Sequence, residues 1–333
     1  MGEGSKIAVL GAGSWGTALA LALCRNGHSI KLWAHRREQV MQMRTMVGNP
    51  GYLPGIVFPA EIEPVENLAQ AVGDADELLA VVPSHAFAGL CRQLGSVGLD
   101  AGKGFAWATK GLSPDGQRFL HDEATELVGE RPLAMISGPS FAREVAMGLP
   151  TALTVASADQ GFADRWAALL HGESTRAYTS SDLVGVEVCG AVKNLLAIAA
   201  GISDGLGFGA NARAALISRG LVEMARLGEA VGASAETFSG LAGLGDLVLT
   251  CTDDQSRNRR AGLALAEGHS RDQIQQQIGQ VVEGIRSVAE VRALAARLEV
   301  EMPITEQVYQ VVHQRADPLE AVRSLLTRQP RAE

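Results

Sequence analysis

This sequence lacks the signatures of several protein classes. It has only 4 cysteines, and none of them lies in a CxxC pattern or beside a histidine cluster. This dispersion favours reduced, buried cysteines in an intracellular protein and predicts no metal site. There is no internal repeat and no low-complexity linker. The first residues show no charged segment followed by an apolar one, as a secretion signal would, so we expect a cytoplasmic protein.

The sequence also has fewer positively charged than negatively charged residues. The chain has 29 Lys and Arg against 37 Asp and Glu, a formal net charge of −8. An acidic surface disfavours nucleic acid and anionic membranes as partners, although it permits a local cationic pocket for a small anion. The length of 333 residues favours two domains. We expect them to be residues 1–183 and 184–333.

The most apolar stretch, VCGAVKNLLAIAAGI at residues 188–202, is too short for a membrane span, which needs roughly 20 apolar residues. Its polar residues are Lys193 and Asn194, side by side at the centre. A helix that is apolar all round should be buried. Burial lowers the pKa of a lysine unless a partner holds its charge, which makes Lys193 a candidate proton donor and acceptor. Alternatively, Lys193 extends its amine to the surface or pairs with a carboxylate.

The first half begins with a nucleotide-binding pattern. An expected strand at residues 6–10 leads into GAGSWG, then into a helix at 17–25 and a second strand at 29–34. A GxGxxG motif in this strand–helix–strand context is the dinucleotide fingerprint. Gly11, Gly13 and Gly16 would let the backbone approach a pyrophosphate at the helix N-terminus. The alternative is a purely structural glycine-rich turn.

The residues after the second strand indicate which cofactor is used. An NAD-specific site usually has an Asp or Glu there, to bind the ribose 2′-hydroxyl. This chain instead has His35, Arg36 and Arg37, and no carboxylate before Glu38. Two guanidinium groups suit a 2′-phosphate, so we expect NADP(H) to be preferred, with NAD(H) possible. Alternatively, Arg36 and Arg37 only solvate a loop.

Further apolar strands are expected at residues 78–82, 104–109, 133–136 and 151–157, alternating with helices. This alternation predicts an α/β domain with a mostly parallel, doubly wound sheet. Ligands bind at the carboxyl ends of such strands, where His85, Lys110 and the stretch at residues 138–142 fall. His85 is a weaker candidate base, because no specific proton for it to move is evident.

The second half is expected to be all-helical, with no strand after Tyr178 and a boundary near residues 180–185. A helix at 211–231 has Leu216, Met224 and Leu227 as core candidates. Ser270 and Gln273 form a predicted capping box. Further helices are expected at 288–298 and 305–314. Asp317 and Pro318 mark the start of another helix.

A second stretch with chemical potential lies between these helices. Asp246 stands among three glycines, and Asp253 or Asp254 is expected to cap a helix whose first turn carries Ser256, Arg257 and Asn258. Backbone N–H groups, an Arg fork and an Asn amide there would converge on a phosphate. In the alternative interpretation, nearby cations pair with the two aspartates on the surface: Arg257, Arg259 and Arg260.

Taken together, GAGSWGTALA, WATKG, SGPSFA, GAVKNLLAIAAGISDGLGFGANARAALI, GLAGLGDLVLTCTDDQSRNR and GQVVEG resemble the bacterial-type NAD(P)-dependent sn-glycerol-3-phosphate dehydrogenases. The resemblance runs from about residue 6 to the last helix. It implies a Rossmann domain, an all-α C-terminal domain and an active site between them. It also implies interconversion of dihydroxyacetone phosphate and sn-glycerol 3-phosphate for glycerophospholipid synthesis, in a protein that is commonly a homodimer.

The resemblance also assigns roles to residues. It implies that Lys193 is the proton donor and acceptor, assisted by Lys110 and Asp246. Further substrate contacts are implied for Gly138, Ser140, Asn194, Ser256, Arg257 and Asn258. Cofactor contacts are implied for Ser14, Trp15, His35, Arg36, Lys110, Ala142, Arg257, Val281 and Glu283.

Two rival functions remain at this stage. One is a related two-domain hydroxyacid or sugar-phosphate dehydrogenase, which a panel of substrates would distinguish. The other is a non-catalytic NADPH-sensing protein, which would need the glycine fingerprint but not a lysine in an apolar helix.

Overall fold

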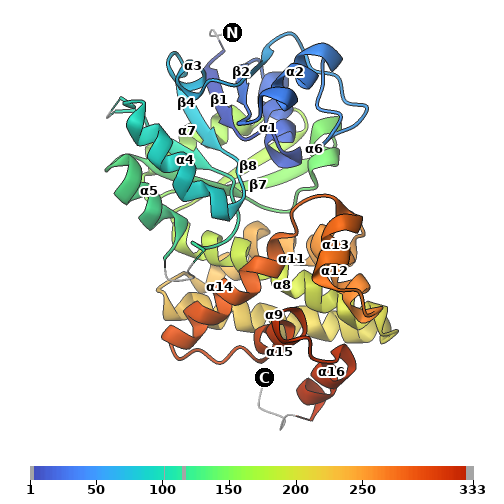
Figure 1. Ribbon diagram of the computed structural model, residues 1–333. Helices are drawn as coiled ribbons and strands as arrows, with labels where there is room; N and C mark the ends of the chain where they lie inside the picture. Colours follow the sequence, from blue (N-terminus) through green and yellow to red (C-terminus); the bar gives the residue numbers. More distant parts are fainter. Residues whose placement is uncertain (1–3, 101, 115–117, 328–333) are drawn as a thin grey trace. The chain divides into compact units, whose positions relative to one another are not determined.

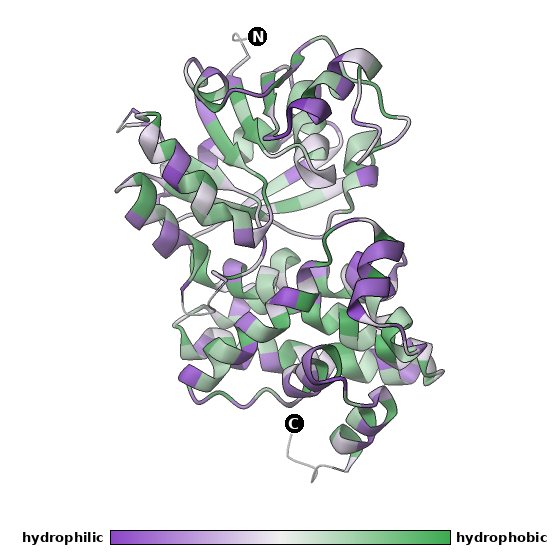
Figure 2. Cartoon of the chain, viewed as in Figure 1, coloured by the Kyte–Doolittle hydropathy of each residue, from purple (hydrophilic) through white to green (hydrophobic). Residues whose placement is uncertain are grey.

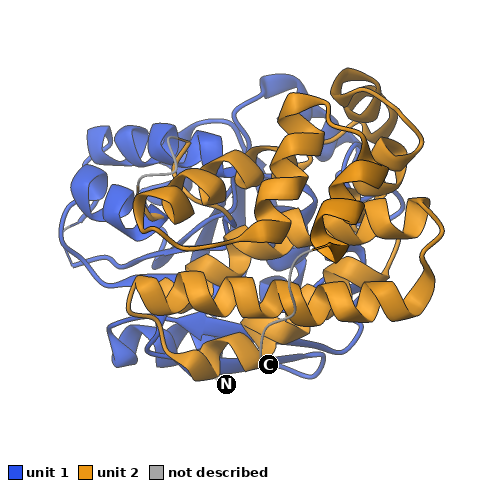
Figure 3. Cartoon of the chain, turned by 90° about the horizontal axis from the view of Figure 1, so that it is seen from below, with its two compact units in different colours: residues 1–110, 120–183 blue, residues 111–119, 184–333 orange. Residues whose placement is uncertain are grey.

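The computed structural model describes residues 4–100, 102–114 and 118–327. The chain divides into two compact units, coloured separately in Figure 3. Unit 1 comprises residues 1–110 and 120–183, and unit 2 comprises residues 111–119 and 184–333. The chain therefore contributes a short segment to unit 2 before it completes unit 1.

Unit 1 is built on one eight-stranded sheet with the strand order β3-β2-β1-β4-β5-β6-β7-β8. Figure 1 labels β1, β2, β4, β7 and β8 of this sheet. All neighbouring strands are parallel except β6 and β7, which are antiparallel. The strands are β1 (Lys6–Leu10), β2 (Ser29–Trp33), β3 (Ile62–Val65), β4 (Glu77–Ala80), β5 (Phe105–Trp107), β6 (Leu133–Ser137), β7 (Thr151–Ala156) and β8 (Thr175–Ser180). The helices are α1 (Ser14–Arg25), α2 (Arg37–Met46), α3 (Leu68–Val72), α4 (Ser84–Ser96), α5 (Leu120–Val128), α6 (Ala142–Met147) and α7 (Gln160–Leu170).

The sequence pattern missed two strands, β3 and β8, and these form the two edges of the sheet. The segment in β3 is IEPV, whose Pro64 lacks an N–H and is tolerated in a sheet mainly at an edge. The β8 segment TRAYTS has mostly half-buried or exposed side chains, so no apolar run marks it. The inner strands, buried on both sides, are the ones that apolar runs predicted correctly.

The regular elements in the described part of unit 2 are all helices. Its helices are α8 (Leu183–Gly205), α9 (Gly209–Ala230), α10 (Ala235–Ser239), the π-helical turn η1 (Leu241–Gly245), α11 (Asp246–Thr252), α12 (Arg257–Ala266), α13 (Arg271–Ile278), α14 (Glu283–Arg297), α15 (Pro303–Gln314) and α16 (Pro318–Leu326). The predicted capping box at Ser270 and Gln273 is present. Asp317 caps α16, with Pro318 at its start, as predicted. The predicted fold class, a Rossmann-type α/β domain followed by an all-α domain, is confirmed.

Helix α8 forms the centre of the unit 2 core. Residues Leu195, Leu196, Ala197 and Ile198 are fully buried. By length and composition α8 could cross a membrane, but 94% of its apolar window is buried within the fold, which is the behaviour of a core helix. Two of the three core candidates on α9, Met224 and Leu227, are buried, whereas Leu216 is half-buried and packs against the core from its margin.

Unit 1 has a separate core. The inner strands of the sheet and helix α1 supply most of it, including Ile7, Val9 and Leu19, all fully buried. The strands are drawn largely in the green of apolar residues in Figure 2. All four cysteines are buried and free of disulfide bonds. Among the described residues, no group of three or more His, Cys, Asp and Glu could hold a metal ion.

Candidate active site

The three glycines of the turn between β1 and α1 have different surroundings. Gly11 has φ +127°, and a Cβ there would lie 2.2 Å from the carbonyl oxygen of Val81. A Cβ on Gly16 would lie 1.8 Å from the carbonyl oxygen of Gly11, so this glycine lets the helix pack on the turn. A Cβ on Gly13 would meet nothing within 4 Å. The space beside Gly13 is therefore open to a ligand.

The start of α1 suits an anion. Gly13 is its N-cap residue and supplies no side-chain hydrogen bond, and no acidic residue lies in the first turn. The first N–H groups of a helix lack intrahelical partners and carry partial positive charge. The indole Nε1 of Trp15 is buried without a hydrogen-bond partner in the described structure. These features fit the pyrophosphate of a dinucleotide cofactor.

A loop that the sequence analysis did not single out supports this turn. Asn49 is 1% exposed. Its amide nitrogen donates to the carbonyl oxygen of Ala12 at 2.9 Å and to the hydroxyl of Thr17 at 2.8 Å. Gln39 donates to the same carbonyl at 2.6 Å. The signal that could have revealed the loop is NPGYLPG, a cluster of turn residues directly after α2.

Arg36 and Arg37 differ in their surroundings. The Arg36 guanidinium donates to the hydroxyl of Tyr52 at 3.1 Å and to Gln39 Oε1 at 3.2 Å. Ser14 Oγ in turn donates to the backbone carbonyl of Tyr52 at 3.1 Å. Arg36 is thus linked to the glycine-rich turn through defined contacts. The Arg37 side chain is 77% exposed and lies 3.9 Å from Glu66, so Arg37 fits the loop-solvating alternative better than Arg36 does.

The ends of β5 and β6 bring together three more of the expected residues. Ser140 Oγ donates to the carbonyl oxygen of Gly138 at 3.0 Å, and Lys110 Nζ lies 3.5 Å from the same oxygen. Gly138 has φ +132°, and a Cβ there would lie 3.0 Å from the carbonyl of Ala152. His85 is exposed in the first turn of α4, and Ala142 begins α6.

In unit 2, Lys193 is paired with a carboxylate. Its Nζ lies 2.6 Å from Asp246 Oδ1 and 3.2 Å from the hydroxyl of Thr250. Lys193 is 7% exposed and Asp246 is 1% exposed. Of the alternatives for Lys193, the structure thus selects the carboxylate pair and not an amine extended to the surface. A carboxylate at this distance favours the ammonium form, which can donate a proton.

Asp246 reaches this position because the backbone before it is compact. A Cβ on Gly243 would lie 2.2 Å from the carbonyl oxygen of Phe238, so only glycine lets the π-helical turn η1 pack there. Asp246 then begins α11, and Thr250 lies one turn later on the same face. Sequence reasoning missed Thr250, whose spacing of four residues from Asp246 was the available signal.

Asn194 and Asn258 are hydrogen-bonded to each other. Asn258 Nδ2 donates to Asn194 Oδ1 at 2.8 Å, and Asn258 Oδ1 accepts from the backbone N–H of Gly284 at 2.9 Å. Both side chains are buried. These bonds join the helix that carries Lys193 to the starts of α12 and α14.

The predicted cap of α12 was wrong. Ser256 is the N-cap residue, and its hydroxyl accepts from the N–H of Arg259 at 3.2 Å. Asp253 instead accepts from the N–H of Gln255 at 2.7 Å in the preceding turn. The helix begins at Arg257, two residues later than a cap at Asp254 would require, because the Ser256 hydroxyl satisfies one of the first N–H groups instead.

The three arginines near the start of α12 have different surroundings. Arg257 Nη1 donates to Gln280 at 3.3 Å. Arg259 is buried and pairs with Asp254, as the surface-pairing alternative expected for that residue, and also with Asp204. Arg260 is exposed. Arg257 therefore stays near the start of the helix, where a phosphate would meet the N–H groups.

Glu283 is an unusual acid at the start of α14. Burial raises its pKa to about 7, although the nearby charges of Arg257 and Arg286 act in the opposite direction. Its Oε2 is buried without a hydrogen-bond partner in the described structure. Val281, two residues earlier, is half-buried.

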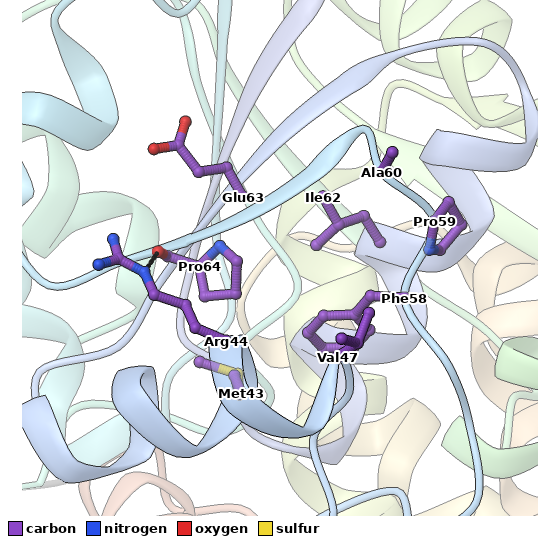
Figure 4. Close-up of a pocket in the computed structure, with 9 residues that line it drawn as sticks. All are labelled: Met43, Arg44, Val47, Phe58, Pro59, Ala60, Ile62, Glu63 and Pro64. Carbon is purple, nitrogen blue, oxygen red and sulfur yellow. Dashed lines mark hydrogen bonds between the residues drawn. The ribbon is translucent and has the colours of Figure 1, made fainter.

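A cavity of about 300 Å³ opens on unit 1 between α2 and β3 (Figure 4). The residues that line it are Met43, Arg44, Val47, Phe58, Pro59, Ala60, Ile62, Glu63 and Pro64. Arg44 Nε donates to the backbone carbonyl of Pro64 at 2.9 Å. None of the residues expected to bind cofactor or substrate lines this cavity.

Both units match known proteins. Residues 6–163 match the family model of the NAD-dependent glycerol-3-phosphate dehydrogenase N-terminus, and residues 182–323 match that of the C-terminus. The glycerol-3-phosphate dehydrogenase [NAD(P)+] of Aeromonas salmonicida is 55% identical over 335 residues, covering 100% of both chains. That of Aeromonas hydrophila is 54% identical with the same coverage.

A solved structure agrees with these matches. The crystal structure of glycerol-3-phosphate dehydrogenase from Coxiella burnetii has a TM-score of 0.95 and 49% identity, covering 98% of this chain and 99% of that one. The match therefore extends over the glycine-rich turn of unit 1 as well as the paired Lys193 and Asp246 of unit 2. The chain belongs to the NAD-dependent glycerol-3-phosphate dehydrogenase family.

Proposed function

We propose that the chain interconverts dihydroxyacetone phosphate and sn-glycerol 3-phosphate with NAD(P)H, to supply glycerophospholipid synthesis. The observation that carries the proposal is the buried pair of Lys193 Nζ and Asp246 Oδ1, 2.6 Å apart. In a chain of this family, a lysine paired in this way is suited to donate a proton to an alkoxide. When bound, the reduced nicotinamide cofactor supplies hydride to the C2 carbonyl carbon of the substrate.

Lys193 acts on the oxygen of the reacting carbonyl. As hydride reaches C2, negative charge develops on that oxygen, and the ammonium group protonates it. General acid catalysis of this kind contributes roughly 10²–10⁴-fold. Asp246 and Thr250 orient the amine, and in the reverse direction the neutral amine accepts the hydroxyl proton. Lys110 adds a second positive charge that stabilises the developing alkoxide.

The phosphate of the substrate is held at a distance from this chemistry. Arg257 offers a fork of N–H donors, and Asn258 and Ser256 stand at the start of α12, whose first N–H groups favour an anion. Asn194, Gly138 and Ser140 complete the proposed substrate contacts. Binding energy from the unreacting phosphate then positions the carbonyl carbon for hydride transfer.

The proposed cofactor contacts lie on both units. Gly11, Gly13 and Gly16 leave room for the pyrophosphate, beside Ser14 and Trp15. His35 and Arg36 contact the adenosine ribose, where Arg36 gives a preference for NADP(H). Contacts further along the chain come from Lys110, Ala142, Arg257, Val281 and Glu283. The fit of the glycine-rich turn supports this part of the proposal.

We also propose a cytoplasmic homodimer, with residues 1–183 as the cofactor domain and 184–333 as the substrate domain. The resemblance to family members that are commonly dimers supports the oligomeric state. Sedimentation velocity on the purified chain tests it. A single species of about 70 kDa, twice the 34.9 kDa of one chain, is expected. A 35 kDa species at micromolar concentration would contradict the dimer.

One spectrophotometric assay tests the activity. The chain is mixed with NADPH or NADH and one of a panel of substrates: dihydroxyacetone phosphate, other phosphorylated ketoses, and keto acids. We expect rapid oxidation of the reduced cofactor only with dihydroxyacetone phosphate. Faster turnover of a keto acid or another sugar phosphate would favour the rival dehydrogenase. Tight NADPH binding without turnover of any substrate would indicate a cofactor sensor.

A further inference from the structure

An ion pair remote from Lys193 on the same helix joins α8 to α12. Asp204 Oδ2, near the end of α8, lies 2.7 Å from Arg259 Nη2 and also 2.7 Å from Arg213 Nη1. The side chains of Asp204 and Arg259 are 9% and 10% exposed, against 28% for Arg213. Arg259 additionally contacts the exposed carboxylate of Asp254. Two carboxylates therefore compensate the charge of Arg259, which disfavours a direct role in binding phosphate.

Beside this ion pair the two helices meet backbone to backbone. A Cβ on Gly201 of α8 would lie 2.1 Å from the carbonyl oxygen of Arg259. A Cβ on Gly262 of α12 would lie 2.1 Å from the carbonyl oxygen of Ile198. Further along, a Cβ on Gly205 would lie 2.6 Å from that of Ala266. At Gly201 and Gly262 no side chain separates the two helices, so their backbones pack directly on each other and leave little room for α12 to shift.

The two helices carry different parts of the proposed chemistry. Lys193 and Asn194 are on α8, whereas Arg257 and Asn258 begin α12. The hydrogen bond between Asn194 and Asn258 fixes the helices at one end of their contact. The side chain of Arg259, one residue after Asn258, reaches along α8 to Asp204. The rotation and translation of α12 along α8 are thus fixed by two polar contacts with close packing between them.

We propose that Arg259, through its pair with Asp204, is a positioning residue for the substrate phosphate. It holds the first turn of α12 in place, so that Arg257 and Asn258 bind the phosphate at a fixed distance from Lys193. The proposal rests on the proposed function, because it requires α12 to bind the phosphate of dihydroxyacetone phosphate. Arg259 itself does not touch the substrate.

Arg213 offers a matched control. It contacts the same oxygen of Asp204 at the same distance, but it lies on α9 and not on α12. The experiment compares Arg259→Lys with Arg213→Lys in the full-length protein. Lysine keeps the charge but cannot bridge two carboxylates as a guanidinium fork can. Measurements are the KM values for dihydroxyacetone phosphate and NADPH, kcat, the inhibition constant of inorganic phosphate and the thermal midpoint.

A misplacement of about 1 Å far from the chemistry can cost up to ~10²-fold in rate. For Arg259→Lys we therefore expect kcat/KM for dihydroxyacetone phosphate to fall by about 10-fold or more, chiefly through KM. The inhibition constant of inorganic phosphate should rise in parallel, while the KM for NADPH stays within about twofold. Arg213→Lys should leave all three constants within about twofold, whatever its thermal midpoint.

Other patterns would overturn the proposal. Equal losses in the two variants would mean that the ion pair only stabilises the unit. An Arg259→Lys variant with unchanged KM and unchanged phosphate inhibition would mean that α12 does not depend on Arg259. If Arg259→Lys does not fold, Asp204→Glu, which keeps the charge but moves the oxygen, is measured against the same constants. Failure of the wild-type chain to reduce dihydroxyacetone phosphate would instead refute the proposed function.

Discussion

Lys193 and Arg259 are both buried cations of unit 2, and carboxylates compensate both of them. The two cations differ in the groups that they contact. Lys193 contacts a carboxylate and a hydroxyl, whereas the guanidinium of Arg259 contacts two carboxylates. An apolar helix with a central lysine was enough to predict that Lys193 is buried, whereas its proposed role as proton donor also needed the other motifs and the family resemblance. Asp204 and Thr250 were not predicted, because their importance depends on contacts between distant segments.

Arg36 should determine cofactor preference more than Arg37 does. Tyr52 and Gln39 hold its guanidinium in place, whereas Arg37 is largely exposed. We expect Arg36→Ala to reduce the ratio of kcat/KM for NADPH to that for NADH by at least about 10-fold, because a charge-assisted bond to the 2′-phosphate is lost. Arg37→Ala, the matched control, should change this ratio by less than about 3-fold. If both variants keep the wild-type ratio, neither arginine recognises the 2′-phosphate.

Glu283 should make stability depend on pH. Burial raises its pKa from the ordinary 4.5 to about 7. A carboxyl whose folded-state pKa is raised stabilises the fold fully below about pH 4.5, and this contribution is lost as pH rises through about 7. The stability of the wild type relative to Glu283→Gln should therefore fall over that interval, by up to about 3 kcal/mol. Urea unfolding of both proteins at several pH values measures the difference. A difference that does not change with pH would show that Glu283 titrates normally.

At the scale of helices and strands, local sequence signals predicted some elements correctly, whereas others were missed or misplaced. The sequence of β1, the glycine-rich turn and α1 predicted the observed strand, turn and helix directly, because Gly11 and Gly16 stand where a side chain would collide with the backbone. The cap of α12 was misassigned among several polar residues that could each accept a backbone hydrogen bond. The edge strands β3 and β8 escaped prediction, because strands at an edge do not need an apolar pattern on both faces.

The loop after α2 should matter for cofactor binding. Asn49 donates two buried hydrogen bonds to the turn region. Its replacement by alanine should cost about 1–3 kcal/mol of stability, because two buried hydrogen bonds are lost. We expect Asn49→Ala to raise the dissociation constant of NADPH, measured by calorimetry. Asn67→Ala is the control, because Asn67 only caps α3. Equal NADPH affinities in the two variants would show that the loop does not shape the turn.

At the scale of the whole molecule, composition and motif order predicted an α/β unit followed by a helical one, and this order is observed. The sequence did not predict that a segment before residue 120 clusters with unit 2. The assignment of this segment to unit 2 depends on tertiary contacts rather than on any local sequence pattern. The family matches span both units, and the proposed function accordingly assigns cofactor binding and proton transfer to one chain.

The most direct test of this chemistry is the turnover of Lys193→Met with NADPH and saturating dihydroxyacetone phosphate, compared with the wild type. Methionine fills a similar volume without an amine, and NADPH affinity measured in parallel reports whether unit 1 is intact. If Lys193 is the proton donor, kcat should fall by about 10²–10⁴-fold, while the dissociation constant of NADPH changes by less than about threefold. A kcat within a few-fold of the wild type would contradict the assignment of Lys193 as the proton donor.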